Sequence, residues 1–394
     1  MKKIKVASFF SGCGGLDIGF EGGFEVHLES VKNKKWINKI NNPRGSVKET
    51  VFQTVFACDI KKSAKISWET NFKRKDTFYL ESIVDLVKKA KNNEFAFPEA
   101  DIVTGGFPCQ DFSIAGKRNG FNSHKTHSNT YVVDEPTIES RGMLYYWLRE
   151  AISIIKPKIF IAENVKGLAT LGDVKDIITE DFRNINGGYI VVAPQILNAA
   201  NFGVPQNRER IFFIGIRRDL LSDEIGKKIL NNEISLYPTA THNKDDFVNT
   251  SKIFNDLPEP EYSDDLSHQK YSKAKWYGKH CQGQTEINPN SVSPTIRAEH
   301  HGNIEYRRLS KENGGQIAEE YHLPQRRLSV RECARLQTFP DNYEFVTDKI
   351  SASEAYKLIG NAVPPLLGYH IAKHIESIWD VLFKEESTIS KKVA

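Results

Sequence analysis

The N-terminal segment places an apolar strand directly before a glycine-rich turn. Residues 4–10 are β-rich, and Ser11-Gly-Cys-Gly-Gly15 leads into Leu16–Glu21, which can open a helix. The backbone N–H groups of such a turn and the positive end of a helix dipole favour an anionic or carboxylate-bearing ligand. This unit predicts an α/β fold that binds a ligand at the carboxyl ends of its strands.

The glycine turn departs from the dinucleotide-binding pattern Gly-x-Gly-x-x-Gly. Gly12 and Gly14 fit the pattern, but Asp17 stands at the third glycine position. A pyrophosphate cofactor, such as the nicotinamide cofactor of an oxidoreductase, is therefore less favoured than a smaller adenosine-containing one.

A second strand is expected over 52–58, and it ends at Asp59. A carboxylate in this place can accept both ribose hydroxyls of an adenosine ligand, and Ile60 could pack on the adenine face. The alternative for Asp59 is a helix N-cap, because a helix is expected over 61–72. A third strand is expected over 77–80.

A cysteine follows another short strand in a stiff turn. Residues 100–104 are apolar, and the chain continues through Gly105-Gly-Phe-Pro-Cys109. Because Pro108 fixes its own φ and restricts the residue before it, the backbone that presents Cys109 is stiff, which suits a nucleophile. A buried structural cysteine is the alternative for any single thiol. The glycine pair before Cys109 and the polar loop after it favour the nucleophile.

Charged side chains from two later strands are expected at the same edge of the sheet. A strand over 158–162 ends at Glu163, which would join Cys109 there. Arg208 and Arg210 precede a further strand. Because they are two residues apart on extended chain, we expect both to point to the same side.

The chain changes character after Arg218. Residues 219–325 are polar with only short apolar segments, which predicts a second domain or a large insert. Residues 31–50 are predicted to be an inserted polar loop, and residues 122–141 a long mobile loop. Helices are expected over 142–155, 327–337 (with Ser329 and Glu332 as a capping box), 354–359 and 366–383.

Arginines are clustered in the sequence, although the net charge of +4 is too small to identify a partner. Clustered arginines suit a surface that contacts phosphates, and scattered solvated arginines are the alternative. The clusters are Arg208, Arg210, Arg217 and Arg218, and Arg297, Arg307, Arg308, Arg326, Arg327, Arg331 and Arg335.

The cysteines and histidines indicate neither disulfides nor a metal. The five cysteines are odd in number and form no Cys-x-x-Cys pair, which fits a reducing cytoplasm. The adjacent His300 and His301 lack a third ligand nearby, so no metal is expected. No signal peptide or membrane-spanning run is seen, and a cytoplasmic location is expected.

In their order, these segments resemble the DNA (cytosine-5) methyltransferases, particularly the bacterial modification methylases. The resemblance covers most of residues 1–218 and 326–383, and the residues between correspond to the family's variable target-recognition region. It rests on Phe10-Ser-Gly-Cys-Gly-Gly15, Gly106-Phe-Pro-Cys-Gln110 with Ser113, Glu163-Asn-Val165, Gln206-Asn-Arg-Glu-Arg210, Arg327–Pro340 and Gly360-Asn-Ala-Val363.

This resemblance implies a Rossmann-like, S-adenosylmethionine-dependent domain with a mixed, mostly parallel sheet and helices on both faces. That domain would comprise residues 1–218 completed by 350–394, and a smaller, irregular target-recognition domain would comprise 219–349. The methyl donor would be S-adenosylmethionine, without a metal. Duplex DNA would be the substrate of a monomeric enzyme that acts beside a restriction endonuclease or as an orphan methylase.

Residue roles carry over from the family position by position. The implied catalytic residues are Cys109, Glu163, Arg208, Pro108 and Asn164. The implied cofactor residues are Phe10, Gly12, Cys13, Gly14, Gly15, Asp59, Ile60, Ser82, Ile83, Pro108, Asn361 and Ala362, with Ser82 in place of the family's common Asp at the adenine amino group. The implied DNA contacts are Gln110, Ser113, Lys117, Arg118, Arg210, Arg297, His300, His301, Asn303, Arg307 and Arg308.

The family's chemistry explains these residue types. Cytosine C5 is a poor nucleophile, so the Cys109 thiolate first adds to C6, and C5 of the resulting enamine then attacks the methyl group. Glu163 would hydrogen-bond N3 and the exocyclic amine. Arg208 would hold the base or orient that carboxylate, and Arg210 would hold phosphate or the neighbouring loop. The cytosine must be flipped out of the duplex, and the loop after Cys109 is a candidate lid.

Two other readings of the resemblance remain. An RNA cytosine-5 methyltransferase would share the scaffold, but the short Cys-Phe-Thr signature of the tRNA-acting relatives is not found. A catalytically inactive DNA-binding relative is opposed by the presence of Cys109, Glu163 and Arg208.

Overall fold

Short apolar strands build one central sheet. The computed structural model of the chain describes residues 3–108, 143–277, 283–298, 304–317 and 322–383. Within these ranges the sheet has eight strands in the order β10-β11-β8-β7-β1-β5-β6, with β9 beside β11. The strands from β8 to β6 are parallel, and β11 runs antiparallel to β8, β9 and β10. They are β1 (Ile4–Phe9), β5 (Phe52–Asp59), β6 (Phe78–Leu80), β7 (Ile102–Gly106), β8 (Ile159–Val165), β9 (Tyr189–Val191), β10 (Gln195–Asn198) and β11 (Glu209–Arg217).

Helices cover both faces of this sheet, because successive strand residues point to opposite sides. Val6 belongs to one hydrophobic cluster and Ala7 to the other. The first cluster includes side chains of α1 (Gly15–Glu21), α2 (Lys62–Phe72) and α12 (Pro365–Phe383). The second includes side chains of α3 (Ile83–Lys91), α4 (Leu144–Ile155) and α5 (Val174–Arg183). The expected Rossmann-like arrangement with a mixed, mostly parallel sheet is confirmed.

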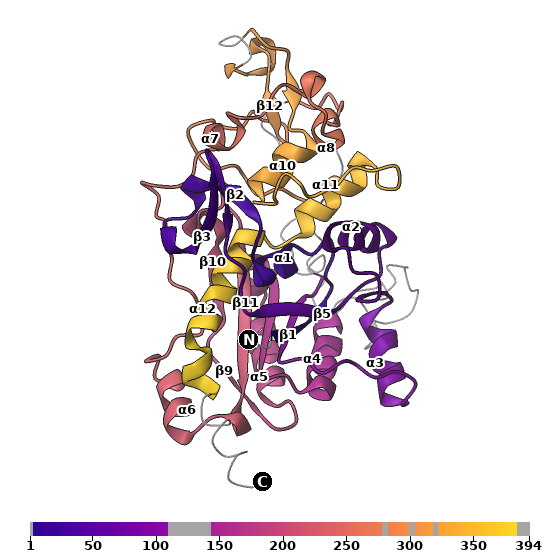
Figure 1. The fold of residues 1–394 in the computed structure, drawn as a ribbon, viewed down its shortest axis with the longest axis vertical. Helices are drawn as coiled ribbons and strands as arrows, with labels where there is room; N and C mark the ends of the chain where they lie inside the picture. Colours follow the sequence, from indigo (N-terminus) through magenta and orange to yellow (C-terminus); the bar gives the residue numbers. More distant parts are fainter. Residues whose placement is uncertain (1–2, 109–142, 278–282, 299–303, 318–321, 384–394) are drawn as a thin grey trace.

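A smaller lobe lies at the top of Figure 1, above the central sheet. We call the described residues between 250 and 336 the small lobe. Its regular elements are few and short, as expected for an irregular region: α7 (Thr250–Phe254), α8 (Leu266–Gln269), β12 (Tyr306–Arg308), β13 (Arg326–Arg327) and α10 (Val330–Leu336). Ser329 and Glu332 form the predicted capping box at the start of α10. Outside the lobe lie α6 (Asp223–Leu230) and α11 (Ala352–Asn361).

The prediction of a loop over 31–50 is wrong. This segment contains two strands of a three-stranded antiparallel sheet in the order β2-β4-β3, which we call the insert sheet (residues 25–47). Its strands are β2 (Glu25–His27), β3 (Ile37–Asn41) and β4 (Arg44–Val47). Trp36 anchors it by packing on Tyr369 and His370 of α12, with ring centroids 5.6 and 5.0 Å apart. The sequence pattern does not predict this sheet because most side chains of β3 face solvent and show no apolar alternation.

Two further expectations concern the chain as a whole. None of the helices in the described ranges is long and apolar enough to cross a membrane. The loop predicted over 122–141 lies outside the described residues.

Candidate active site

Two parallel strands bring their carboxyl ends together at the expected edge. Gly106 of β7 lies opposite Glu163 of β8. A Cβ atom on Gly106 would lie 3.0 Å from Oε2 of Glu163, so glycine leaves room for that carboxylate. Pro108 follows, partly exposed, at the end of the described segment. The predicted residues Cys109, Gln110, Ser113, Lys117 and Arg118 lie outside the described residues.

Glu163 is nearly buried and pairs with a cation from the neighbouring strand. In the antiparallel pairing, Phe212 of β11 lies opposite Glu163. Arg210, two residues earlier, therefore points to the same face, and its Nε lies 3.1 Å from Oε1 of Glu163. Burial raises the pKa of Glu163 above its usual value, while the charges of Arg210 and Arg208 oppose that rise. The site thus holds a carboxyl group that keeps its proton more readily than one in water.

Arg208 and Arg210 differ in their contacts. The close ion pair to Glu163 comes from Arg210, which was expected at phosphate or loop structure. Arg208 is 1% exposed, and its Nη1 and Nη2 donate to the carbonyl oxygens of Ile296 and Gly360 at 3.0 and 2.9 Å. The two side chains diverge because β11 begins at Glu209, so Arg208 is not on the strand. Arg208 joins two distant segments and acts on Glu163 through its charge.

Asn164 fixes the backbone that leads to the predicted nucleophile. Its side chain is 1% exposed, and Nδ2 donates to the carbonyl oxygen of Phe107 at 3.0 Å. Its Oδ1 accepts from the backbone N–H of Val165 at 2.8 Å. Asn164 therefore couples the end of β8 to Phe107, two residues before Cys109 in the sequence.

The glycine turn and Asp59 form the second half of the edge. Asp59 Oδ2 accepts from the backbone N–H of Gly12 at 3.2 Å, and Oδ1 accepts from that of Lys61 at 2.9 Å. Burial raises the pKa of Asp59, and these backbone donors oppose that rise. Asp59 is not the N-cap of α2. That position is taken by Lys61, whose side chain makes no capping hydrogen bond.

Apolar surface is left uncovered beside Asp59. Ile60 is 46% exposed, and Leu80, which lies opposite Asp59 on β6, is 44% exposed. A Cβ atom on Gly12 would meet nothing within 4 Å. Phe10 has a φ of 54°, which is uncommon for a residue other than glycine and typical of functional turns. An adenosine group fits here, because the edge offers apolar side chains for a base and a carboxylate for a ribose.

Comparison with known proteins identifies the family. The sequence profile of the C-5 cytosine-specific DNA methylases matches residues 4–377. The chain belongs to this family. It is 31% identical to the Type II methyltransferase M.BsuRI of Bacillus subtilis, over 99% of this chain and 83% of the relative. It is 34% identical to the Type II methyltransferase M.BspRI of Lysinibacillus sphaericus, over 95% of this chain and 81% of the relative.

Solved structures share the fold of this methylase. A putative DNA modification methyltransferase from a prophage of E. coli has a TM-score of 0.57 at 18% identity and covers 96% of this chain and 100% of its own. The Entamoeba histolytica methyltransferase EhMeth has a TM-score of 0.58 at 15% identity and covers 97% and 99%. The chain is therefore a DNA cytosine-5 methyltransferase, of a family that uses S-adenosylmethionine.

The glycine turn of the methylase packs against the predicted C-terminal cofactor residues. A Cβ atom on Gly15 would lie 2.4 Å from the carbonyl oxygen of Val363 and 3.0 Å from Cβ of Ala362, so only glycine allows this approach. Asn361 is exposed at the end of α11. Cys13 is buried, and burial raises the pKa of its thiol.

Ser82, the suggested contact of the adenine amino group, lies at the start of a helix. The Ser82 hydroxyl accepts from the backbone N–H of Val84 at 3.2 Å and is the N-cap of α3. Both Ser82 and Ile83 are buried, at 6% and 3% exposure. A serine in this place therefore serves the helix start.

Most of the clustered arginines are internal, which corrects the expectation of a phosphate-contacting face. Arg308 is 2% exposed and donates to both carboxylate oxygens of Glu259, at 2.9 and 2.6 Å. Arg307 lies 3.5 Å from Glu332 and covers the ring of Phe254 at 4.8 Å. The four arginines from 326 to 335 are also buried, and three of them pair with carboxylates: Arg326 with Glu332 and Glu259, Arg331 with Asp265, and Arg335 with Asp256 and Asp341.

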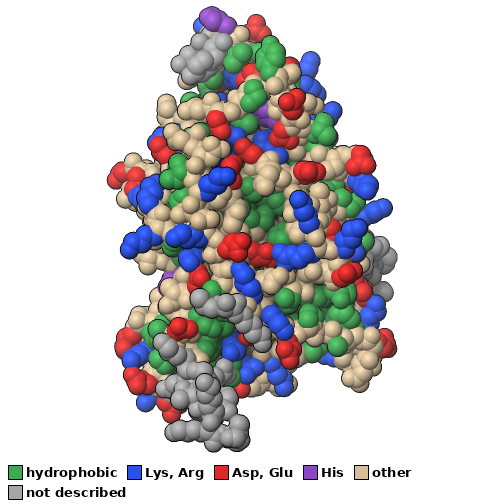
Figure 2. Space-filling view, in the orientation of Figure 1, with side chains coloured by type: hydrophobic (Ala, Val, Ile, Leu, Met, Phe, Trp, Pro, Cys, Tyr) green, Lys and Arg blue, Asp and Glu red, His purple; other side chains and the backbone are tan. Residues whose placement is uncertain are grey.

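Two of the predicted DNA contacts, Arg307 and Arg308, lie next to acidic side chains of the small lobe. Arg297 is partly exposed, and His300, His301 and Asn303 lie outside the described residues. On the face drawn in Figure 2, acidic and basic side chains are interspersed. Within the described ranges no group of three His, Cys, Asp or Glu side chains could hold a metal ion.

Sequence reasoning missed two buried amides that join the site to the rest of the methylase. Gln206 Nε2 donates to Oε1 of Gln337 at 3.1 Å, and Gln206 Oε1 accepts from the backbone N–H of Ile296 at 3.0 Å. Gln337 Nε2 in turn donates to the carbonyl oxygen of Ile359 at 2.7 Å. The only available signal was the position of Gln206 two residues before Arg208.

Proposed function

We propose that this methylase transfers the methyl group of S-adenosylmethionine to C5 of a flipped-out cytosine in a specific duplex DNA sequence. The observation that carries the proposal is the ion pair of the buried Glu163 with the partly exposed Arg210 beside Gly106, which comes three residues before Cys109 in the sequence. Addition of a thiolate to cytosine C6 needs a carboxyl group that can hydrogen-bond or protonate the base.

The reaction begins when the Cys109 thiolate adds to C6 of the cytosine, forming a C–S bond. Glu163, whose pKa is raised by burial, hydrogen-bonds N3 and assists its protonation as the adduct forms. C5 of the enamine then attacks the methyl carbon carried by the sulfonium, which leaves S-adenosylhomocysteine. Water removes the C5 proton, Cys109 is expelled as thiolate, and the N3 proton returns to Glu163, so that neutral 5-methylcytosine is released.

The chain's own residues supply the binding surfaces for this chemistry. Phe10 and Ile60 would flank the adenine, Asp59 would accept from the ribose hydroxyls, and the turn from Gly12 to Gly15 would hold the methionine end. S-adenosylmethionine, when bound, supplies the electrophilic methyl group.

DNA recognition is assigned to residues 219–349, which include the small lobe. The target cytosine is inaccessible in a stacked duplex, so it must be flipped into the site between this region and the sheet edge. We infer a monomeric enzyme that acts within a restriction-modification system, as the Type II names of its relatives suggest.

Trapping tests the nucleophile directly. Duplex DNA with 5-fluorocytosine at the target carries fluorine where the C5 proton must leave, so wild type with S-adenosylmethionine should form a stable covalent complex on a denaturing gel. Cys109→Ala should form none while still binding DNA, and Cys281→Ala serves as the matched thiol control that still traps. Trapping by Cys109→Ala would refute the assignment.

A further inference from the structure

The insert sheet makes contact with the small lobe and with the segments on either side of it. We propose that the insert sheet is a brace that holds the small lobe at a fixed position over the active-site edge, with Arg44 as its positioning residue. This inference rests on the proposed function, because the position of the lobe matters for placing DNA above Glu163 and Cys109.

Arg44 is held rigidly before it reaches its partners. It lies on β4, the middle strand, where its backbone pairs with His27 on one side and Asn41 on the other. The side chain is 9% exposed. Its Nε donates to Oε1 of Glu25, and its Nη2 lies 3.6 Å from Oδ1 of Asp341. Asp341 belongs to the segment directly after α10.

From Asp341 the charges continue into the small lobe. Arg335 of α10 donates from Nε to Oδ1 of Asp341 at 2.8 Å, and from Nη2 to Oδ2 of Asp256 at 3.2 Å. Arg335 also donates from Nη1 to the carbonyl oxygen of Ile253 on α7 at 2.8 Å. Although burial acts in the opposite direction, Arg335 and Arg44 hold the pKa of Asp341 below its usual value. Five alternating charges therefore run from Glu25 to Asp256 without a break.

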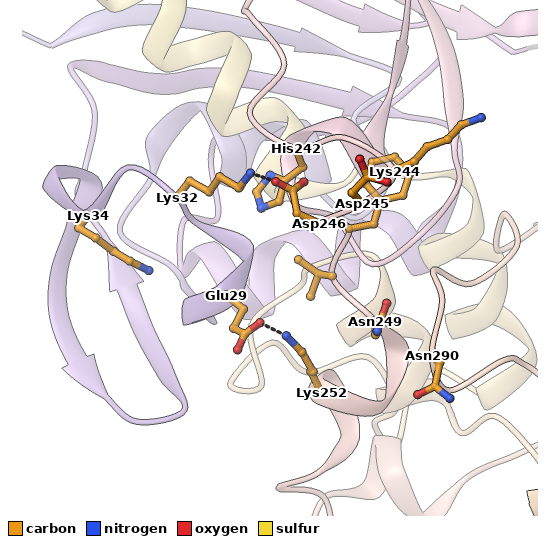
Figure 3. A pocket seen from close by; sticks show the side chains of 12 residues that line it. Glu29, Lys32, Lys34, His242, Lys244, Asp245, Asp246, Asn249, Lys252 and Asn290 are labelled. Atoms are coloured by element: carbon orange, nitrogen blue, oxygen red, sulfur yellow. Dashed lines mark hydrogen bonds and ion pairs between the residues drawn. The ribbon is translucent and has the colours of Figure 1, made fainter.

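Two exposed ion pairs reinforce this connection. Figure 3 shows Lys32 directed at Asp246 and Glu29 directed at Lys252 across an open pocket of about 690 Å³. Exposed pairs contribute little individually, so we assign them a supporting role. The backbone of the insert sheet at Ser30 also packs closely against Gly203. A Cβ atom on Gly203 would lie only 2.0 Å from the carbonyl oxygen of Ser30.

Removal of the Arg44 charge should not unfold the protein, because it leaves neither Glu25 nor Asp341 buried without a partner. The Glu25 side chain is 33% exposed and can be solvated, and Asp341 keeps Arg335 as a partner. What disappears is the buried ionic link from the insert sheet through Asp341 to the small lobe, while the exposed Glu29–Lys252 pair remains. We therefore expect Arg44→Met to raise KM for DNA about five- to tenfold, which lies within the range of coupling energies for residues in one charge network. The value of kcat at saturating DNA and KM for S-adenosylmethionine should stay within about twofold.

The experiment measures steady-state methyl transfer for Arg44→Met, Arg44→Lys, Asp341→Asn and the Arg44→Met/Asp341→Asn double variant. Arg44→Lys should recover most of the DNA affinity, and the double variant should be no worse than the poorer single. Arg183→Met on α5, where an exposed arginine donates to the carbonyl oxygen of Val191 and to Glu180, is the control for the same substitution away from the insert sheet and should keep the wild-type KM for DNA. Additive effects, or a KM for DNA that Arg44→Met leaves unchanged, would overturn the brace. Absence of methyl transfer by wild type would instead refute the proposed function.

Discussion

Nε of Arg210 lies 3.1 Å from Oε1 of Glu163 across the antiparallel pair of β8 and β11. The pair places one cation beside the carboxyl group that we assign to cytosine N3. Because burial raises the pKa of Glu163 and this cation opposes the rise, the pair sets the pH range in which Glu163 carries a proton.

Arg210→Met should therefore move the pH dependence of methyl transfer. Loss of the cation raises the pKa of Glu163 further, so the protonated form persists to higher pH. The limb of kcat/KM that falls as pH rises should shift to higher pH, and kcat should fall about 10²-fold or more. Rapid-quench measurements between about pH 5.5 and 9 would show the shift. Arg210→Lys keeps a positive charge, so its kcat/KM should decrease at nearly the same pH as that of wild type. If the decrease in kcat/KM does not move to higher pH in Arg210→Met, the assignment is contradicted.

Arg208→Lys should weaken the protein as a whole. Arginine reaches the carbonyl oxygens of Ile296 and Gly360 with two nitrogens, and the single ammonium of lysine cannot bond both in the same geometry. We expect the free energy of unfolding in urea to fall by about 1–3 kcal/mol, with weaker binding of both DNA and S-adenosylhomocysteine. The control is Arg210→Lys, whose stability should stay close to wild type. A change in kcat alone would show that Arg208 acts only in the chemistry.

Glu332→Gln should break the charge network of the small lobe. The arginines around Glu332, Arg326 foremost, lower its pKa from 4.5 to about 2 against the effect of burial. A carboxyl group whose pKa is lower in the folded than in the unfolded state stabilises the fold at pH values above the unfolded-state pKa. This contribution is lost as the pH falls from about 4.5 towards 2. At pH 7 the substitution should cost about 3–5 kcal/mol of unfolding free energy.

Urea unfolding at several pH values checks this prediction. The difference between wild type and Glu332→Gln should narrow as the pH falls below about 4.5. Glu312→Gln, at an exposed position of the same lobe, should match wild type throughout. A difference that stays constant with pH would mean that the ionised state of Glu332 is not what stabilises the lobe.

His370→Leu should make the methylase less sensitive to mild acid. His370 is buried between Trp36 and Phe202, and its Nε2 has no hydrogen-bond partner among the described residues. Burial lowers its pKa to about 3, so that the unfolded chain takes up a proton near pH 6.5 while the native one does not. Stability is therefore lost from about pH 6.5 down to 3.

At pH 7, thermal melts of His370→Leu and wild type should differ by no more than about 1.5 kcal/mol. Towards pH 4.5 the variant should gain about 2–3 kcal/mol relative to wild type. His374→Leu, four residues later on α12 and partly solvated, should show no such gain. Parallel pH curves for His370→Leu and wild type would contradict the assignment.

Much of the fold could be predicted from local patterns. The strands that begin at Ile4 and Phe52 are predictable because short apolar runs stop at turn residues, and the helix after Ser329 because its capping box is local. The insert sheet was missed because its long-range pairing leaves little apolar periodicity. The roles of Arg208 and Arg210 depended on whether the strand starts at residue 209, a shift of one or two positions that the sequence does not resolve.

The arginine cluster shows why charge alone misled the site prediction. Arg308, Arg326, Arg331 and Arg335 meet carboxylates that lie 49 to 79 residues earlier in the chain. No local pattern reveals partners at such a distance, so buried and DNA-facing arginines look alike in the sequence.

That separation also constrains any attempt to retarget the enzyme. The acids Asp256, Glu259 and Asp265 come before residue 325, whereas Arg326, Arg331 and Arg335 come after it. A chimera cut at residue 325 would combine the carboxylates of one parent with the guanidinium groups of another. Donor segments should therefore be chosen for acids at these three places, or transplanted as one piece that extends beyond Asp341, before any altered sequence preference is interpreted.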